Sequence, residues 1–564
     1  MKHYLFLALV FLYLGFLPNA YSQEKISKYP QGYFRNPLDI PILLAGNFGE
    51  CRPNHFHSGL DIKTNGKENL IVRAAANGYI SRMKIERGGF GHALYVTHPN
   101  GFTTLYAHLN DFAPKLQYYL RAQQYKKQSW TVDLTFSPEQ FPVDKGEQIA
   151  WSGNTGGSSA PHLHFEIRDT KTEHPLNGSL FGFDIKDTQA PIPTDLALYS
   201  MDEDFYQQTP NYYKLIKKGT YYTTKDTIKA SATALGFGIQ VNDFMNNSIN
   251  TLNFYEATWA IDGQQQGKIT LDDIGYDETR YLHAYADYRS KVLRNEWYQC
   301  LFKLPGNALN IYEGLNNNFG VSHLTTGYHS MTIELIDAYD NKAIIQLNLL
   351  VAASNATISC NNTLKHQQSY ELTPYPNLQL QLNNQVFYTD VCFSVANTSD
   401  TGSYSEKYTI AERTIPAHNY FTIRIKPNKP VPFALRNKMV LLYQDEINTS
   451  GMAAKLEDAW YKNRVRKFGT YYLKVDTTAP ILQNLQKSSD VSKLKTLRIQ
   501  ATEEMTSIKE FRATIDGKWV LFEPFGNVYV YKFDQFCGKG KHELIVKAVD
   551  ENDNERTIVY SFIR

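Results

Sequence analysis

The sequence lacks the features that mark integral membrane proteins and nucleic-acid-binding proteins. No long apolar run follows residue 17 and the mean hydropathy is −0.42, so we expect no membrane span in the mature chain. The formal net charge is only +2 over 564 residues, which gives no reason to expect nucleic acid as a partner. The helical zinc motif HExxH is also absent.

Cysteine is scarce, and none of the five cysteines forms a CxxC metal or redox motif. They are Cys51, Cys300, Cys360, Cys392 and Cys537. The odd number leaves at least one thiol free. In an oxidising compartment we expect Cys360 and Cys392 to be able to pair, although spacing alone does not fix the connectivity.

The first residues have the pattern of a cleaved signal peptide. A basic start at Lys2 precedes an apolar run over 4–17, and Ala20 and Ser22 are small residues at the two positions that a signal peptidase reads. The run is short for a membrane span. We therefore predict a signal peptide over 1–22 and an exported chain in the periplasm or cell envelope.

Two short stretches, His57-Ser-Gly-Leu-Asp61 and His162-Leu-His164, contain the strongest chemical signal. Side chains at i and i+2 of a β-strand point to the same face, so His162 and His164 are expected to face one cavity. Two imidazoles and one carboxylate fill three positions of a catalytic zinc ion and leave the fourth for water. The sequence therefore predicts a zinc site built on a β-strand.

An ordered set of motifs around these residues resembles the lysostaphin-like, LytM-type zinc metallopeptidases. Most members of that family cut peptide bonds in bacterial peptidoglycan. The resemblance covers roughly residues 40 to 170, a minority of the chain. Its segments are His57–Asp61, Ala74–Gly78, Gly89–Gly91, Tyr106–Leu109, Gly146–Ala150, Gly153–Gly156 and Pro161–Glu166.

Carried over residue by residue, the resemblance implies that His57, Asp61 and His164 bind the Zn²⁺ ion. It further implies that His108 and His162 form the catalytic pair beside the water that attacks the substrate. A histidine that titrates near neutrality can take a proton from this water and later deliver one to the leaving amine. Which of the two histidines is the base stays open.

Three neighbouring side chains are expected to support the site. Arg52 and Asn54 are predicted to contact carboxylate or carbonyl groups of the substrate. Glu166 shares a strand face with His164, and three roles stay open for it: it orients an imidazole, pairs with Arg168, or has a surface role. The remaining histidines near the motifs are interpreted as structural: His55, His92, His98 and His174.

A long insertion over 110–142 separates the Tyr106–Leu109 segment from the next family motif. Its spacing of apolar residues predicts a short amphipathic helix over 114–125, with proline at the first turn, and a strand over 130–136. Two placements stay open: the insertion forms a wall or a lid of the active-site groove, or its helix packs on the outside of the sheet.

An internal repeat indicates that several β domains follow. Asp187–Ile192 returns as Asp476–Ile481, Ile261–Gly263 returns as Ile515–Gly517, and Asp337-x-x-Asp340-Asn341 returns as Asp550-x-x-Asp553-Asn554. In each copy, alternating strands flank the acidic turn, as in the closing hairpin of immunoglobulin-like or fibronectin-like β-sandwiches. The acidic turns either bind calcium or cap backbone amides.

The predicted fold is mainly β, with an antiparallel β-sheet peptidase domain, a short helical insertion and several β-sandwiches. The predicted domains are 23–186 (peptidase), 187–352 (first repeat copy), 353–475 (β domain) and 476–564 (second repeat copy). We interpret the β domains as scaffolds that set the reach of the peptidase. A glycan, a peptide or a protein partner on them is the alternative.

These observations together predict a secreted zinc metalloendopeptidase. Its substrate is predicted to be the peptide of peptidoglycan cross-links, which a zinc-activated water hydrolyses. Two alternatives stay open: a non-catalytic cell-wall-binding activator of other wall hydrolases, and a zinc peptidase that acts on extracellular proteins. All five predicted positions are occupied by suitable side chains, which favours catalysis.

Overall fold

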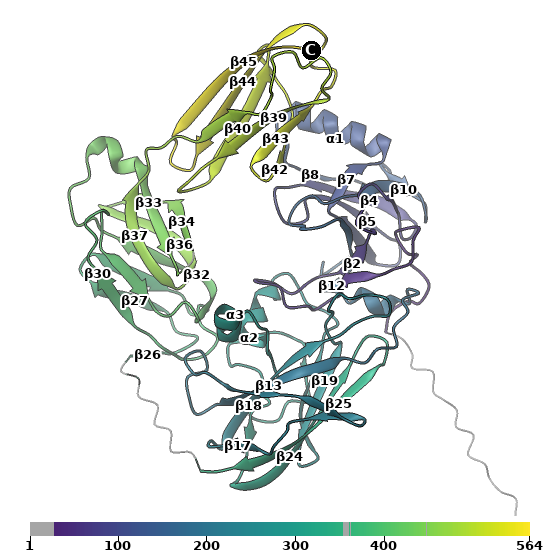
Figure 1. The fold of residues 1–564 in the computed structure, drawn as a ribbon, viewed down its shortest axis with the longest axis vertical. Coiled ribbons are helices and arrows are strands. Elements are labelled where there is room, and N and C mark those ends of the chain that lie inside the picture. The colour runs from purple at the N-terminus through teal and green to yellow at the C-terminus, as the bar shows by residue number, and fades with distance from the viewer. Residues whose placement is uncertain (1–27, 354–359, 361, 447) are drawn as a thin grey trace, which may run out of the picture.

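The computed structural model describes residues 28–353, 360, 362–446 and 448–564, so the predicted signal peptide over 1–22 lies outside the described residues. Four β-rich regions follow one another around a closed circuit (Figure 1). We call them the N-terminal region (28–186), the first sandwich (187–353), the middle sandwich (362–476) and the last sandwich (477–564). The predicted mainly β fold is confirmed, whereas the exact domain boundaries and the immunoglobulin-like or fibronectin-like assignment stay predictions.

The N-terminal region contains a nine-stranded sheet and a three-stranded sheet that share one hydrophobic core. The large sheet has the order β1-β2-β11-β6-β5-β4-β8, with β12 on β11 and β9 on β4. Its strands are β1 (Leu44–Gly46), β2 (Leu60–Lys63), β4 (Gly78–Ile85), β5 (His92–Thr97), β6 (Phe102–Ala107), β8 (Val132–Thr135), β9 (Pro142–Val143), β11 (His162–Asp169) and β12 (Pro175–Leu176). The small sheet comprises β3 (Ile71–Arg73), β10 (Gln148–Ser152) and β7 (Leu109–Phe112), and the 3-10 helix η1 (Gly178–Phe181) follows.

The predicted insertion forms helix α1 (Pro114–Lys127) and strand β8. Pro114 occupies the first turn, Leu116 and Leu120 are buried, and the helix ends at Gln128 in the left-handed region. Strand β8 extends the edge of the large sheet by pairing with β4, while α1 contacts β7. This arrangement matches the placement in which the helix packs on the outside of the sheet.

The first sandwich consists of two facing sheets whose shared core includes the fully buried Trp259. One sheet contains β13 (Ile192–Ser200), β14 (Asn211–Lys214), β18 (Ala234–Asn242), β21 (Gln299–Cys300) and β23 (Ser322–His323). The other contains β15 (Ile216–Lys218), β16 (Tyr221–Thr223), β17 (Ile228–Ala230), β19 (Glu256–Ile261), β20 (Gln264–Thr270), β22 (Tyr312–Glu313), β24 (Gly327–Ile336) and β25 (Lys342–Val351). Three short helices separate β20 from β21: η2 (Thr279–Tyr281), α2 (Leu282–Tyr285) and α3 (Tyr288–Arg294).

The middle sandwich has two five-stranded sheets and one two-stranded sheet. The first five-stranded sheet contains β27 (Tyr370–Tyr375), β28 (Leu378–Leu382), β32 (Pro416–Ile425), β36 (Trp460–Lys467) and β35 (Lys455–Glu457). The second contains β30 (Val395–Thr398), β31 (Lys407–Ile410), β37 (Gly469–Val475), β33 (Met439–Gln444) and β34 (Thr449–Ala453). Strands β26 (Thr363–Leu364) and β29 (Val391–Cys392) form the small sheet, and η3 (Phe433–Lys438) precedes β33.

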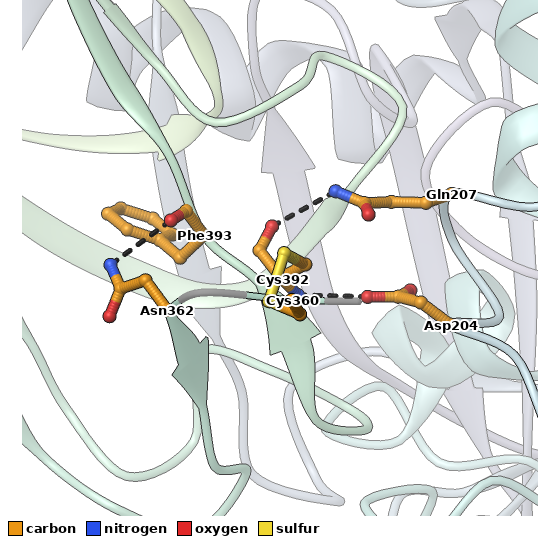
Figure 2. The surroundings of a disulfide bond; sticks show 6 residues. All are labelled: Asp204, Gln207, Cys360, Asn362, Cys392 and Phe393. Atoms are coloured by element: carbon orange, nitrogen blue, oxygen red, sulfur yellow. Dashed lines mark hydrogen bonds between the residues drawn. A yellow bond between two sulfur atoms is a disulfide. The ribbon is translucent and has the colours of Figure 1, made fainter. Parts of the chain in front are cut away.

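A disulfide joins Cys360 to Cys392 at the start of the middle sandwich, as the sequence suggested (Figure 2). The backbone of Cys392 is also tied to the first sandwich. Its amide donates to Asp204 Oδ2 at 2.9 Å and its carbonyl accepts from Gln207 Nε2 at 3.0 Å. The other three cysteines, all in described residues, are free.

The last sandwich repeats the closing hairpin of the first sandwich, because β44 and β45 pair in the same way as β24 and β25. One sheet contains β38 (Ile481–Asn484), β39 (Thr496–Thr502), β43 (Val528–Lys532) and β42 (Phe522–Phe525). The other contains β41 (Lys518–Trp519), β40 (Ile508–Ile515), β44 (Lys541–Asp550) and β45 (Glu555–Ile563).

The last sandwich closes the circuit by contacting the insertion of the N-terminal region (Figure 1). Arg121 of α1 forms an ion pair of 2.6 Å with the buried Glu523. The ring of Tyr125 stacks on Phe536 with centroids 4.0 Å apart, and its hydroxyl donates to Asp534. Within the described residues, none of the helices has the length and apolar character needed to cross a bilayer.

Candidate metal centre

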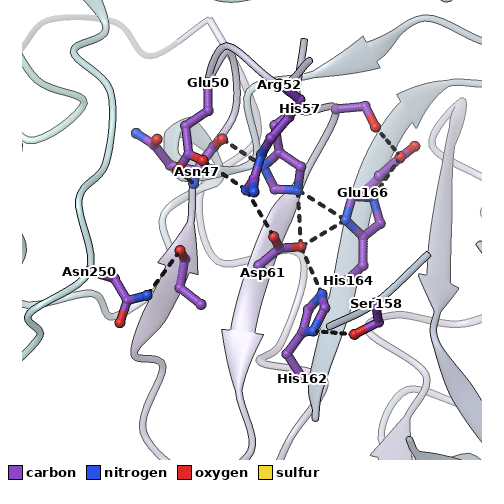
Figure 3. A network of polar contacts seen from close by, with 12 residues as sticks. Asn47, Glu50, Arg52, His57, Asp61, Ser158, His162, His164, Glu166 and Asn250 are labelled. Carbon is purple, nitrogen blue, oxygen red and sulfur yellow. Dashed lines mark hydrogen bonds and ion pairs between the residues drawn. The ribbon is translucent and has the colours of Figure 1, made fainter. Parts of the chain in front are cut away.

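Three of the predicted site residues bring one donor atom each to a single point between β2 and β11 (Figure 3). His57 Nε2 lies 3.0 Å from Asp61 Oδ1 and 3.1 Å from His164 Nδ1. His164 Nδ1 lies 2.9 Å from Asp61 Oδ1 and completes the triangle. The two strands create this geometry because they pair antiparallel with His164 directly opposite Asp61.

The side-chain alternation predicted for β11 is present. Leu163, Phe165 and Ile167 are buried in the core of the N-terminal region. His162 and His164 therefore project from the opposite face, where Asp61 of β2 lies. The local sequence thus determines which face of the strand carries the donor atoms.

The outer nitrogen of each donor histidine is already occupied by an acceptor. His57 Nδ1 donates to the carbonyl of Asn47 at 2.7 Å, and His164 Nε2 donates to Glu166 Oε1 at 2.8 Å. Each neutral ring then presents a lone pair on its inner nitrogen, because one nitrogen of a neutral imidazole donates and the other accepts. These contacts fix the tautomer that a metal ligand requires.

His108 and His162 stand next to each other beside this triangle, with ring centroids 4.8 Å apart. His108 Nδ1 donates to the carbonyl of Thr155 and His162 Nδ1 donates to that of Ala160, both at 2.8 Å. His162 Nε2 lies 3.3 Å from Asp61 Oδ1. The inner nitrogens of both rings are therefore directed toward the donor atoms and are free to accept a proton.

Two glycine-rich turns hold His108 in place. His108 has a φ of 58° at the break between β6 and β7, and its amide donates to the carbonyl of Phe90 at 3.0 Å. The turns that carry Phe90 and Thr155 approach so closely that a Cβ on Gly91 would lie 2.5 Å from the amide nitrogen of Gly156. Only glycine permits this approach, which aligns the two carbonyls that position His108.

Three groups of the cluster have strongly shifted pKa values. Burial opposes ionisation of Asp61, but His57, His162 and His164 hold its pKa well below the ordinary value. Burial also opposes protonation of His164, yet Asp61 and Glu166 raise its pKa to about 9. In His108, burial and repulsion from the other histidines lower the pKa to about 3. The cluster therefore combines an ionised carboxylate with a neutral His108 at neutral pH.

Glu166 serves two of the three roles that the sequence left open, and its complete burial shows that the surface role was wrong. It is fully buried, accepts from His164, and pairs with Arg168 Nε at 2.6 Å. Its pKa is lowered because Arg168 and His164 outweigh the effect of burial. The hydroxyls of Ser58 and Tyr276 also donate to Glu166 Oε1, at 2.6 and 2.7 Å. Sequence reasoning missed Tyr276, because it lies in the first sandwich and no local motif marks it.

The predicted substrate contacts occupy different positions. Arg52 points at the donor cluster, where its guanidinium lies 3.2 Å from Asp61 Oδ2 and 2.8 Å from Glu50 Oε2. It therefore orients the second oxygen of Asp61. Asn54 is exposed and accepts a hydrogen bond from His55. A contact of Arg52 or Asn54 with substrate stays a prediction.

The other histidines near the motifs have partners away from the triangle. His92 Nδ1 donates to the carbonyl of Asn110, His98 Nδ1 donates to that of Asn77, and His174 Nδ1 contacts Asp273 Oδ1. Burial lowers the pKa of both His92 and His98. These contacts agree with the structural roles that the sequence suggested.

A pocket of about 520 Å³ lies on the face of the large sheet that carries the donor atoms. Arg168 connects the two places, because it follows His164 on the same face of β11 and lines this pocket. Further lining comes from Arg82, Tyr95 and Asp133.

Two protein-family models match parts of the chain. Residues 55–125 match Peptidase family M23, which confirms the resemblance inferred from the motifs, and residues 361–476 match the Zu5-like domain. The N-terminal region thus contains an M23 peptidase domain of the LytM type, whose relatives include a metalloprotease.

Curated relatives and a solved structure are each similar to a part of the chain. The DD-carboxypeptidase/endopeptidase Mpg of Neisseria meningitidis is 36% identical over 112 residues, which is 20% of this chain and 20% of that protein. The cell division protein DipM of Caulobacter vibrioides is 27% identical over 179 residues, 32% of this chain and 23% of that protein. The catalytic domain of lysostaphin from Staphylococcus simulans is 26% identical with a TM-score of 0.14, covering 25% of this chain and 80% of that one. The chain thus spans about a fifth of the length of the first curated relatives.

Proposed function

We propose that this chain, which carries an M23 peptidase domain, is a zinc metalloendopeptidase that hydrolyses the peptide cross-links of peptidoglycan. The proposal includes an exported location in the periplasm or cell envelope, where peptidoglycan lies. It is supported by relatives that are named a DD-carboxypeptidase/endopeptidase and a cell division protein.

One observation carries the proposal: all four histidines of the centre have their outer nitrogen bound to a carbonyl or carboxylate. These acceptors belong to Asn47, Glu166, Thr155 and Ala160. The inner nitrogens of His57, His162 and His164 converge on the ionised Asp61. A cation bound there would replace the proton that Asp61 otherwise holds on His164.

The donor set suits zinc in particular. Two imidazole nitrogens and a carboxylate oxygen are typical ligands of catalytic zinc, with bonds of about 2.0–2.1 Å. Tetrahedral ligands at that distance are roughly 3.3 Å apart, and the three donor atoms of His57, Asp61 and His164 are separated by 2.9 to 3.1 Å. Only a small expansion of the triangle is needed.

The proposed mechanism divides the work between metal ligands and proton carriers. Bound zinc would polarise the scissile carbonyl and lower the pKa of water to about 7. His108 and His162 lie beside the ligands with their Nδ1 atoms donating outward, so one of them would accept the proton on its inner nitrogen and could then donate a hydrogen bond to the developing oxyanion. Glu166 and Arg52 hold His164 and Asp61 in place.

The test is digestion of purified peptidoglycan sacculi by the full-length protein. We expect new amine termini to appear, to disappear with a zinc chelator, and to return when zinc is restored. His164→Ala should abolish zinc binding and activity. The matched control is His323→Ala, which changes an exposed histidine of the first sandwich and should leave both intact.

Each failure has a specific meaning. If the wild-type protein binds zinc and leaves sacculi uncut but cleaves an unfolded protein, the substrate assignment is wrong. If it cuts neither and instead stimulates another wall hydrolase, the chain is an activator. If His164→Ala retains zinc and activity, the metal-ligand assignment is wrong.

A further inference from the structure

Two groups of acidic side chains outside the metal centre converge in the same way. The first acidic triad consists of Asp187, Asp243 and Asp337, and the second of Asp476, Glu503 and Asp550. In each triad one carboxylate oxygen per residue lies within 4.8 Å of the other two. The first triad lies in the first sandwich, and the second joins Asp476, the last residue of the middle sandwich, to two residues of the last sandwich.

Strand register makes the two triads equivalent. Ile192 at the start of β13 pairs with Asn242, the residue before Asp243. In the last sandwich, Ile481 at the start of β38 pairs with Thr502, the residue before Glu503. The repeat in the sequence identified the other two members of each triad. The pairing adds Asp243 and Glu503 as the third members.

The remaining contacts also repeat between the triads. The carbonyl of Asp187 accepts from Asn341 at 3.4 Å, and the carbonyl of Asp476 accepts from Asn554 at 3.2 Å. Asp337 accepts from the amides of Tyr339 and Asn341, as Asp550 does from Asn552 and Asn554. These hydrogen bonds shape each turn but leave other carboxylate oxygens unused.

Several of those oxygens are buried without a hydrogen-bond partner among the described residues. They are Asp187 Oδ2 and Asp243 Oδ1 in the first triad and Asp476 Oδ2 in the second. The side chain of Asp243 is 2% exposed and that of Asp476 is fully buried. An unpaired buried carboxylate oxygen is strongly unfavourable unless a proton or a cation compensates it.

No basic side chain forms an ion pair with either triad among the described residues, although the charge of Lys438 acts on Asp476 in the second triad. Burial and the neighbouring carboxylates raise the pKa of Asp243 to about 8. Burial likewise raises the pKa of Asp187 to about 6. Each triad therefore holds negative charges that repel one another in a poorly solvated place.

We propose that each acidic triad is a binding site for one Ca²⁺ ion. The donors are all oxygen atoms, which suits a hard cation, and no nitrogen or sulfur ligand is present to select zinc. Calcium tolerates irregular oxygen cages better than magnesium does, because magnesium demands a near-octahedral shell.

The position of the triads gives the cation a structural consequence. Asp187 and Asp476 each lie where the chain enters a sandwich from the preceding region. Tyr339, in the turn that carries Asp337, packs against the core of the N-terminal region. Asn552, in the turn that carries Asp550, donates to the carbonyl of Met439 in the middle sandwich at 3.1 Å. Calcium at both triads would therefore stiffen two junctions of the circuit.

The test is a calorimetric titration of the calcium-free full-length chain with calcium chloride. We expect the wild-type protein to bind two equivalents. Asp243→Asn and Glu503→Gln should each bind one, and the double variant none. The controls Asp226→Asn and Glu510→Gln alter exposed carboxylates in the same two sandwiches and should retain two equivalents.

Thermal unfolding gives an independent readout. Without calcium at about pH 9, where Asp243 is ionised, Asp243→Asn should raise the midpoint because it removes a repelling charge, whereas loss of a merely structural contact would lower it. With calcium, the wild-type protein should instead have the higher unfolding midpoint of the two. Absence of binding at millimolar calcium, or two equivalents in every variant, would overturn the proposal. Neither result bears on peptidase activity, which is measured separately.

Discussion

The hydroxyl of Tyr276 donates a 2.7 Å hydrogen bond to Oε1 of Glu166, the same oxygen that accepts from His164 Nε2. Tyr276 belongs to the first sandwich, while Glu166 and His164 belong to the N-terminal region. The guanidinium of Arg168 donates to the same hydroxyl at 2.7 Å and lies over the Tyr276 ring. The first sandwich thus contributes directly to the support of a proposed metal ligand.

This contact predicts that Tyr276→Phe lowers the zinc affinity and the hydrolysis rate but does not abolish them. Loss of such supporting partners typically costs about 10–100-fold in metal affinity or activity. Glu166 retains Arg168 and Ser58, so we expect a loss of about tenfold. Zinc competition with a chromophoric chelator and the rate of peptide hydrolysis measure it. The control Tyr328→Phe changes a tyrosine that is 77% exposed in the same sandwich, and it should alter neither zinc affinity nor hydrolysis rate. Equal effects of both variants would contradict a specific role of Tyr276 at the centre.

The division between ligands and proton carriers predicts two classes of histidine variant. His57→Ala should lose zinc, because it removes a donor atom. His108→Ala and His162→Ala should retain zinc but lose about 10²–10⁴-fold in hydrolysis rate, the usual contribution of general acid–base groups. Metal content by atomic absorption and turnover on the same samples distinguish the classes. Loss of zinc from His108→Ala would show that His108 is a ligand.

Closure of the circuit predicts an effect of Arg121→Ala on shape and stability. The variant leaves the buried Glu523 with Lys532 at 3.5 Å as its remaining ion-pair partner. Breaking a buried pair costs about 3–5 kcal/mol, and Lys532 together with the partial exposure of Arg121 should reduce this to less than about 3 kcal/mol. Small-angle scattering should report a larger radius of gyration.

The matched control for Arg121→Ala is Arg82→Ala, which removes an ion pair with the exposed Asp133 in the same region. Such surface pairs contribute about 0–1 kcal/mol. We expect no change in the radius of gyration in this control. An unchanged radius in both variants would mean that the ion pair does not hold the last sandwich in place.

His283 predicts that acid weakens the junction between the first sandwich and the N-terminal region. Its Nε2 donates to the carbonyl of Pro53 at 3.1 Å, and burial with nearby Arg280 lowers its pKa to about 3. The pKa of His283 is lower in the folded protein than in the unfolded chain, so acid favours the unfolded chain, which binds the proton more readily. The free energy of unfolding that His283 contributes is therefore complete above about pH 6.5 and is lost as the pH falls toward 3. Urea unfolding should therefore show a free energy that falls over this range.

The variant His283→Gln keeps an amide donor but cannot titrate, so its unfolding free energy should fall less steeply with pH. His323→Gln, at an exposed position, should follow the wild-type slope. If His283→Gln keeps the full slope, other groups account for the acid sensitivity.

Much of the fold and the site could be predicted where the cause is local. The alternation over 161–167 placed His162 and His164 on one face, since the backbone of a strand sets that period. The apolar spacing and Pro114 predicted helix α1, which the structure extends to Lys127. The pairing of Cys360 with Cys392 was one option in the sequence and required the folded chain to establish it.

The sequence by itself determined the donor residues and the repeated acidic turns, because these follow from residue type and short-range geometry. Only the tertiary structure decided that Tyr276, 110 residues away, supports Glu166. It also decided that Asp243 and Glu503 complete the acidic triads and that the last sandwich returns to α1. Such contacts depend on how separate sheets pack and pair in register, and no local pattern in the chain encodes which distant side chains will meet.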